Sequence, residues 1–302
     1  MGSTAPSPPV ADGDAPLRLP LGLGLRPRRP TALLDAGFEV VRFRFFTVIA
    51  VVLVIQLPLV VLPSLVSTFA ALDRARQFVE PQSEPIAAGG FNLYATDVGV
   101  WGWVTVVGGL LSVALAGVAL THLLTSWSVG RDPGVGETLG VVARRLPVVL
   151  AAWLMAIPIR VLGAAVCGVG LLFAVAWLFV VSPVIASEPV GPWRAIKRSF
   201  HLTGRRLGPV LGLVCMVAIV AGILEAVVDG IAAAVSAGED VSTLVVLLVT
   251  IGSLLVTLGL TALHGAWSAL AYLDLRVRVE GLDLLLAAPA ELDPTPRRWA
   301  PA

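Results

Sequence analysis

The sequence predicts an all-α membrane protein with six transmembrane helices in three hairpins, each hairpin preceded by a short interfacial amphipathic helix. Three observations lead to this prediction: six long apolar stretches, a one-sided distribution of basic residues, and an amphipathic segment before every second stretch. The stretches approach or exceed the ~20 residues with which an α-helix crosses a bilayer core. They cover residues 45–66, 100–127, 147–164, 168–187, 208–230 and 241–271.

The basic residues predict the orientation of these helices. If the termini and alternate connections share one compartment, only Arg74, Arg76 and Arg160 of the 21 Lys and Arg residues lie outside it. Cytoplasmic loops of membrane proteins carry such an excess of positive charge. We therefore expect both termini in the cytoplasm and external connections near residues 73–97 and 230–241.

The composition fits a membrane protein and not a soluble domain. Hydrophobic residues make up 57% of the chain and charged residues only 14%, far from the balance of a soluble domain. Twenty of the 21 basic residues are Arg, and Lys197 is the sole Lys. Together with heavy use of Ala, Val, Gly and Pro, this bias suggests a high-GC bacterial genome and hence a plasma-membrane protein.

The chain divides into one membrane domain and two tails. Residues 1–30 contain seven prolines and no apolar periodicity, which predicts a disordered Pro-rich cytoplasmic tail. Residues 31–286 form the predicted six-helix membrane domain, and 287–302 form a short cytoplasmic tail. The run 273–284 alternates apolar and charged residues, as a strand does, but a lone strand would have no partner. We expect the last helix to end near Tyr272 and the run to lie along the cytoplasmic surface.

The segments 31–44, 134–146 and 192–206 share an apolar pattern. In each, the apolar positions step by four, three and four residues, which places them on one face of an α-helix. An arginine occupies the equivalent position before each following apolar stretch: Arg44, Arg145 and Arg206. We expect the three segments to lie parallel to the inner membrane surface, to bend sharply into the next helix, and to form a collar.

The segment 192–206 separates apolar from basic residues most clearly. Its basic face suits lipid phosphates if the helix lies in the interface. The compatible alternative is a connector that packs on the bundle's own inner surface. The sequence therefore predicts contacts with the headgroups of the anionic inner leaflet for the basic residues of the three segments. These are Arg44, Arg145, Arg194, Lys197, Arg198, Arg205 and Arg206.

Two stretches resemble a known family. The first is SEPVGPWRAIKRSFHLTGRRLGPVLG at 187–212, and the second is AYLDLRVRVEGLDL at 271–284. Both are similar to the six-helix bacterial integral membrane family known as the membrane domain of glycerophosphoryl diester phosphodiesterase. The matching positions are Glu188, Gly191, Pro192, Ala195, Arg198, Ser199, Leu202, Tyr272, Asp274, Arg276, Arg278, Glu280, Gly281 and Asp283.

The resemblance implies an architecture and hardly an activity. The family takes its name from proteins in which this membrane region is fused to a soluble catalytic domain. Here no expected segment outside the membrane exceeds ~30 residues, whereas a barrel enzyme needs ~250. We therefore expect no catalytic domain in this chain and no enzymatic activity.

The sequence contains no catalytic or metal-binding motif. Its three histidines, His122, His201 and His264, are far apart in sequence, and no HExxH or Cys/His cluster occurs. We expect His122 and His264 to contact neighbouring helices through hydrogen bonds, which is the more common role of such residues in membranes. The sequence predicts no cofactor and no nucleic-acid partner.

Three ionisable residues fall inside the predicted spans: Arg160, Glu225 and Asp229. A charge in hydrocarbon costs ~2.5–3.5 kcal/mol even on lenient scales. At the helical rise of 1.5 Å per residue, all three would lie in the outer third of the membrane. Either Arg160 snorkels outward while the acids mark the end of their helix, or the three form an ion pair or line an outward cavity.

The functional expectation is a non-catalytic bacterial membrane protein, acting as a scaffold or lipid-interacting subunit through its basic cytoplasmic helices. The alternative is a small-solute transporter or channel that uses Arg160, Glu225 and Asp229. Transporter sites usually lie near the midplane on broken helices, whereas these charges are expected off-centre.

Overall fold

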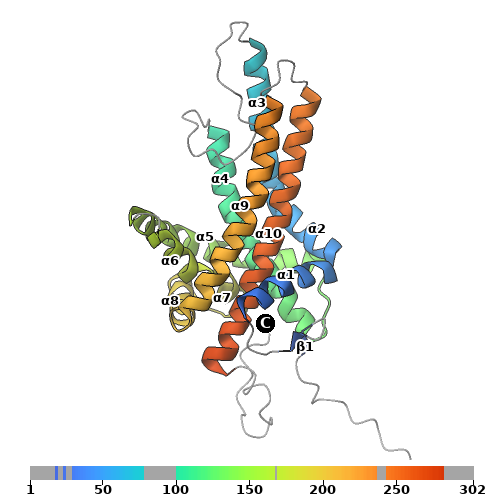
Figure 1. Ribbon diagram of the computed structural model, residues 1–302. Helices are drawn as coiled ribbons and strands as arrows, with labels where there is room; N and C mark the ends of the chain where they lie inside the picture. Colours follow the sequence, from blue (N-terminus) through green and yellow to red (C-terminus); the bar gives the residue numbers. More distant parts are fainter. Residues whose placement is uncertain are drawn as a thin grey trace, which may run out of the picture.

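The computed structural model describes residues 18–19, 23–24, 29–77, 100–166, 169–236 and 243–281. Helices dominate these ranges (Figure 1). They are α1 (Pro30–Phe43), α2 (Phe45–Gln56), α3 (Leu62–Gln77), α4 (Val100–Ser128), α5 (Val135–Ala165), α6 (Val169–Leu178), α7 (Val181–Ser187), α8 (Pro192–Gly204), α9 (Leu207–Ser236) and α10 (Thr243–Glu280), with a π-helical turn, η2 (Leu57–Val61), between α2 and α3.

Six helical runs in the described residues are long and apolar enough to cross a membrane, which confirms the predicted fold class. They are Phe45–Ala70, Val100–Ser128, Val135–Ala165, Val169–Ser187, Leu207–Ala234 and Thr243–Glu280. The first run comprises α2, η2 and most of α3, and the fourth comprises α6 and α7. Large apolar side chains on the outer faces of α9 and α10, such as Ile223 and Leu255, are exposed, as expected for lipid-facing helices.

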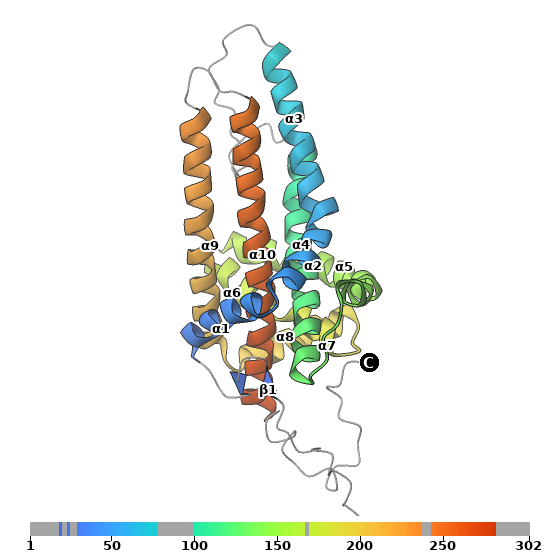
Figure 2. The same cartoon turned by 90° about the vertical axis from the view of Figure 1, so that its right-hand side faces the viewer.

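Four long elements, α3, α4, α9 and α10, run alongside one another, while α1 and α8 lie across one end of this bundle (Figures 1 and 2). We call this the basal end and define it by α1, α8 and residues 272–280 of α10. It is the lower end in both views, and α10 ends on this side.

The helical conformation is interrupted between α1 and α2 and again between α8 and α9. Pro30 and Pro192 open α1 and α8, because proline lacks the N–H that the first helical turn leaves unpaired. At Arg44 the backbone leaves the helical region (φ −132°, ψ 54°) before α2 begins. The second break lies between Gly204 and Leu207, where α8 ends and α9 begins. The sharp bends predicted for segments 31–44 and 192–206 are therefore present.

The prediction for the segment 134–146 is wrong in one respect. It continues without a break into the following apolar stretch as one helix, α5, which contains Pro147 and Pro158. The whole of α5 and its partner α6 lie across the long helices (Figures 1 and 2). Because the apolar stretch keeps the direction of the amphipathic segment, no bend is needed at Arg145.

Close backbone contacts hold α4 against its neighbours. In a regular α-helix, residue 63 would donate its N–H to the carbonyl of Leu59, but Pro63 has no N–H. The chain widens here into η2, where the Leu62 N–H bonds to the Leu57 carbonyl. The Leu59 carbonyl then lies so close to Gly108 of α4 that any Cβ at residue 108 would collide with it. Glycine at 108 therefore lets the two backbones meet.

A buried polar contact joins α2 to α10. The Gln56 side chain is almost fully buried. Its Nε2 donates to Thr261 Oγ1 at 2.6 Å and to the Thr257 carbonyl at 3.4 Å. Such interhelical hydrogen bonds stabilise membrane bundles by roughly 0.6 kcal/mol on average.

The helix α10 extends further than the sequence predicted. It continues through Tyr272 to Glu280 and ends at Gly281, whose positive φ of 62° suits glycine. The charged run is helical because its charges pair at four-residue spacing: Arg276 with Glu280 at 3.0 Å, and Arg278 with Asp274 at 2.7 Å. The alternation of apolar and charged residues in the run 273–284 therefore accompanies ion pairs within a helix and does not mark a strand.

The two predicted tails lie almost entirely outside the described residues. From the N-terminal tail the structure describes residue 29, the start of α1 and two short strands, β1 (Arg18–Leu19) and β2 (Leu23–Gly24), which pair antiparallel. The remainder of 1–30 and the segment 287–302 are outside those ranges. So are residues 78–97 and 237–241 of the two predicted external connections.

Candidate functional site at the basal end

A network of charged and hydroxyl groups joins α7, α8 and α10 at the basal end. Glu188, directly after α7, accepts a hydrogen bond from Tyr272 Oη at 3.0 Å and one from Arg198 Nε at 3.2 Å, both on Oε1. Arg198 also reaches Glu280 Oε1 at 2.5 Å through Nη2. Arg276 Nε donates to Glu280 Oε2 at 3.0 Å and completes the set. We call these five residues the basal network.

The basal network is charge-balanced and mostly shielded. It contains two carboxylates and two guanidinium groups, and the charged side chains are 14–28% exposed. Arg276 also lies over the Tyr272 ring, with Cζ 5.8 Å from its centroid. Partly desolvated ion pairs with several hydrogen bonds interact more strongly than isolated surface pairs. The network therefore fixes α8 to α10, and each of its two carboxylates is paired with a guanidinium group.

The basal network joins the two sequence stretches at 187–212 and 271–284. Glu188 and Arg198 come from the first stretch, and Tyr272, Arg276 and Glu280 come from the second. Sequence reasoning found both stretches but did not predict that they meet. Their contact could have been inferred from two features of the sequence. The two stretches carry complementary charges, and each follows an apolar span that ends on the same predicted side of the membrane.

Tryptophans near the basal ends of α4, α6 and α10 hold the crossing helices. Trp267 of α10 is fully buried, donates from Nε1 to the Leu34 carbonyl of α1 at 3.1 Å, and meets the Phe38 ring edge-on. Trp127 of α4 packs edge-on against Phe43, with centroids 5.7 Å apart. The sequence contains Trp-Ser both at 127–128 and at 267–268, and each of these tryptophans contacts α1.

An equivalent anchor holds α8. Trp177 of α6 stacks on Phe200 with ring centroids 5.1 Å apart. The Trp177 carbonyl accepts a hydrogen bond from the buried Ser199 Oγ at 2.5 Å. The face of α8 that packs on the bundle therefore includes Ser199, whereas the apolar side chain of Trp193 is 53% exposed. This face of α8 thus agrees with the alternative given for the segment 192–206, a connector that packs on the bundle.

The seven predicted headgroup contacts divide into two groups. Arg198 turns inward to Glu188 and Glu280, so the structure corrects its assignment to the lipid-facing set. The physical reason is that two carboxylates, one directly after α7 and one on α10, lie within ion-pairing distance of its guanidinium. The other six lie on the surface or are half-buried: Arg44, Arg145, Arg194, Lys197, Arg205 and Arg206.

Arg44, at the bend between α1 and α2, forms an ion pair with the connection that follows α4. Its Nη2 lies 2.6 Å from Asp132 Oδ2, and Asp132 Oδ1 accepts a hydrogen bond from Trp127 Nε1 at 3.2 Å. Both charged side chains remain about half exposed. Arg44 is thus both a structural contact and an accessible cation.

The three intramembrane charges do not form the predicted ion pair. Within the described residues no carboxylate lies within ion-pairing distance of Arg160, and both Glu225 and Asp229 are exposed on α9. The depth argument assumed that α5 runs along the bundle. Because α5 instead lies across it, helical rise along α5 does not measure depth.

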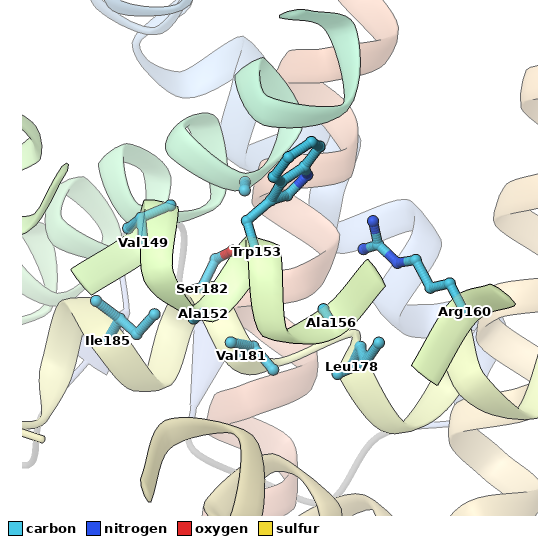
Figure 3. A pocket seen from close by; sticks show the side chains of 10 residues that line it. Val149, Ala152, Trp153, Ala156, Arg160, Leu178, Val181, Ser182 and Ile185 are labelled. Atoms are coloured by element: carbon cyan, nitrogen blue, oxygen red, sulfur yellow. The ribbon is translucent and has the colours of Figure 1, made fainter. Parts of the chain in front are cut away.

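Arg160 and Trp153 line a cavity of about 40 Å³ between α4, α5, α6 and α7 (Figure 3). Ser182 contributes a hydroxyl group, and the remaining lining is apolar. Arg160 Nε and Trp153 Nε1 are both buried without a hydrogen-bond partner. The volume exceeds the ~10–15 Å³ that a single water needs, but it is too small for most solutes.

The histidines of α4 and α10, His122 and His264, have different surroundings. His264 packs edge-on against Phe179, with centroids 5.3 Å apart, and His122 Nε2 is buried without a partner. Among the described residues, no group of three or more His, Cys, Asp or Glu side chains could hold a metal ion. The geometry thus provides contacts between helices and a basic surface.

Comparisons of the chain with protein-family models, curated proteins and solved structures gave no match.

Proposed function

We propose that this protein is a non-catalytic integral membrane protein of the bacterial plasma membrane, with both termini cytoplasmic, that acts as a lipid-interacting scaffold. The observation that carries the proposal is the gathering of exposed cations at the basal end. There α8 presents Arg194, Lys197 and Arg205 to solvent while its opposite face is held by the basal network and Trp177. A helix fixed in this way has a constant basic face.

The chemistry of that face suits the phosphates of anionic lipids. A cationic side chain near an anionic leaflet contributes ~1 kcal/mol of attraction. Lys197 lies 5.3 Å from the centroid of the exposed Trp193 ring, and tryptophan prefers the membrane–water interface. The combination of an interfacial ring and surrounding cations supports the placement of α8 at the inner leaflet. The resemblance of 187–212 and 271–284 to a bacterial membrane family is one reason that we place the protein in a bacterial plasma membrane.

The direct test measures stabilisation of the purified protein by anionic lipid. Phosphatidylglycerol should raise the unfolding temperature of the wild-type protein more than phosphatidylcholine does, because a ligand of the folded state stabilises it. Arg194→Gln/Lys197→Gln should weaken the phosphatidylglycerol effect by about 2 kcal/mol, or roughly thirty-fold in affinity. Added salt should reduce the wild-type effect, since exposed charges are screened.

The matched control removes two basic residues from the opposite end of the first span. Arg74→Gln/Arg76→Gln changes the net charge equally and should leave the lipid effect unchanged. Equal responses from the two double variants would contradict a specific basal surface. Solute flux or substrate turnover by the protein in liposomes would contradict the non-catalytic proposal, and flux abolished by Arg160→Gln would favour the transporter alternative.

A further inference from the structure

Two of the six apolar runs lie in a direction that does not suit a membrane crossing. The elements α3, α4, α9 and α10 run together in both views, whereas α5 and α6 cross them near the level of α1 and α8 (Figures 1 and 2). The hairpin starts after α4 at the basal end and returns through α7 to α8 at the same end. At 1.5 Å per residue α5 is about 46 Å long, and it extends mainly sideways from the bundle.

We propose that the α5–α6 hairpin does not cross the membrane but lies within the leaflet at the basal end, in contact with acyl chains. The protein then crosses the bilayer four times, and an even number of crossings keeps the termini on one side. The inference concerns the placement of the hairpin and does not depend on the proposed function.

The composition of the hairpin's turn supports this placement. Residues 161–175 (VLGAAVCGVGLLFAV) contain no charged residue and no Ser, Thr, Asn or Gln. In contrast, the predicted external connection 73–97 contains several charged residues, and Gly238-Glu239-Asp240 lies in the other. A turn that emerges into water normally carries polar residues to hydrate its backbone. An apolar turn is expected where its surroundings are hydrocarbon.

The turn also brings two backbones together without polar side chains. A Cβ on Gly163 would lie 2.7 Å from the Gly170 carbonyl oxygen, and a Cβ on Gly170 would lie 2.5 Å from the Gly163 oxygen. Close packing through glycine is characteristic of helices in lipid. Around this contact the side chains of Val161, Leu162 and Val166 are more than 60% exposed, so the end of the hairpin is covered by apolar side chains.

Arg160 provides an independent argument. As part of a crossing helix it would lie in hydrocarbon at a cost of ~2.5–3.5 kcal/mol, and no carboxylate among the described residues pairs with it. Arg160 and Trp153 point to the same side of α5, and each has a buried N–H donor without an acceptor (Figure 3). In a hairpin that stays in one leaflet, a water in the cavity can accept from these buried donors, and the partly exposed remainder of the Arg160 guanidinium can snorkel to lipid phosphates or ester carbonyls.

The test uses single cysteines in the full-length protein with Cys167→Ser and Cys215→Ser. Val166→Cys reports the turn, Gly136→Cys the start of α5, and Val100→Cys the far end of α4. A membrane-impermeant maleimide is applied to intact cells and to inverted vesicles. We expect Gly136→Cys and Val100→Cys to react from opposite sides. Val166→Cys should react from neither side and only after solubilisation in detergent.

Labelling of Val166→Cys from the Val100 side would show a crossing hairpin and overturn the proposal. Labelling from the Gly136 side would place the turn in water and would also overturn it. A second copy of the protein could also shield Val166→Cys from the maleimide. To distinguish this from burial in lipid, the Val166→Cys variant is labelled with a fluorophore and placed in liposomes whose lipids carry a nitroxide quencher on the acyl chain. Quenching supports contact with acyl chains, and its absence refutes it. Val161→Cys provides a second position for both measurements.

Discussion

Replacing Glu188 of the basal network should destabilise the protein measurably. Glu188→Ala removes the acceptor shared by Tyr272 and Arg198, whereas Arg198 keeps its contact with Glu280. A hydrogen bond to a charged group contributes ~1.5–3 kcal/mol. Since the Glu188 side chain is 17% exposed, we expect a combined loss of about 2 kcal/mol, below the ~3–5 kcal/mol of a broken, fully buried pair.

The assay is thermal unfolding in detergent, followed by intrinsic tryptophan fluorescence. A loss of this size corresponds to a fall of about 4–8 °C in the unfolding temperature. Glu188→Gln keeps an acceptor oxygen and should lose about half as much. In a double-mutant cycle, Glu188→Ala with Arg198→Ala should be less destabilising than the sum of the single changes by ~1 kcal/mol.

The control is Glu39→Ala, which removes an exposed carboxylate from α1. Surface substitutions of this kind change stability by ~0.5 kcal/mol or less. Similar unfolding temperatures for Glu188→Ala and Glu39→Ala would show that the basal network does not hold α8 to α10. Strict additivity of Glu188→Ala and Arg198→Ala would show the same for their ion pair.

Three further predictions concern the packing and topology of the bundle. Gly108→Ala should lower the unfolding temperature sharply, because the new methyl group collides with the Leu59 carbonyl, whereas Gly109→Ala, which meets no neighbouring atom, should not. Gln56→Leu should destabilise the protein by ~0.5–1.5 kcal/mol through loss of the interhelical hydrogen bond, measured by unfolding in detergent; no loss would refute that role. Reporter fusions after Gly89 and after Gly136 should report the outside and the inside of the cell, and a cytoplasmic signal after Gly89 would exclude the predicted orientation.

The apolar stretches predicted the helices well because length and hydropathy are local properties of the chain. The bends at Arg44 and before Leu207 were also predictable, since an amphipathic segment and an apolar stretch favour different surroundings. The same pattern was misleading at Arg145. Whether an amphipathic segment bends depends on the direction of the next helix, which tertiary packing decides.

The sequence predicted some residues of the candidate site but not the contacts that they make with one another. The sequence identified Arg198 as basic and amphipathic, yet its role follows from Glu188 and Glu280, which belong to distant parts of the chain. The error for Arg160 has a similar origin. A depth calculated from helical rise is valid only for a helix along the membrane normal, and α5 lies across the bundle.

The contact between η2 and α4 also constrains how this sequence can diverge. At the close approach to Gly108, the Leu59 carbonyl lacks the N–H that residue 63 would donate in a regular α-helix, because that residue is Pro63. A larger residue at position 108 is therefore excluded while Pro63 is present. If Pro63 changes first, the restored N–H can draw the carbonyl back into the helix, and position 108 becomes free to vary. The two sites are epistatic, and the order of substitution decides which evolutionary paths remain open.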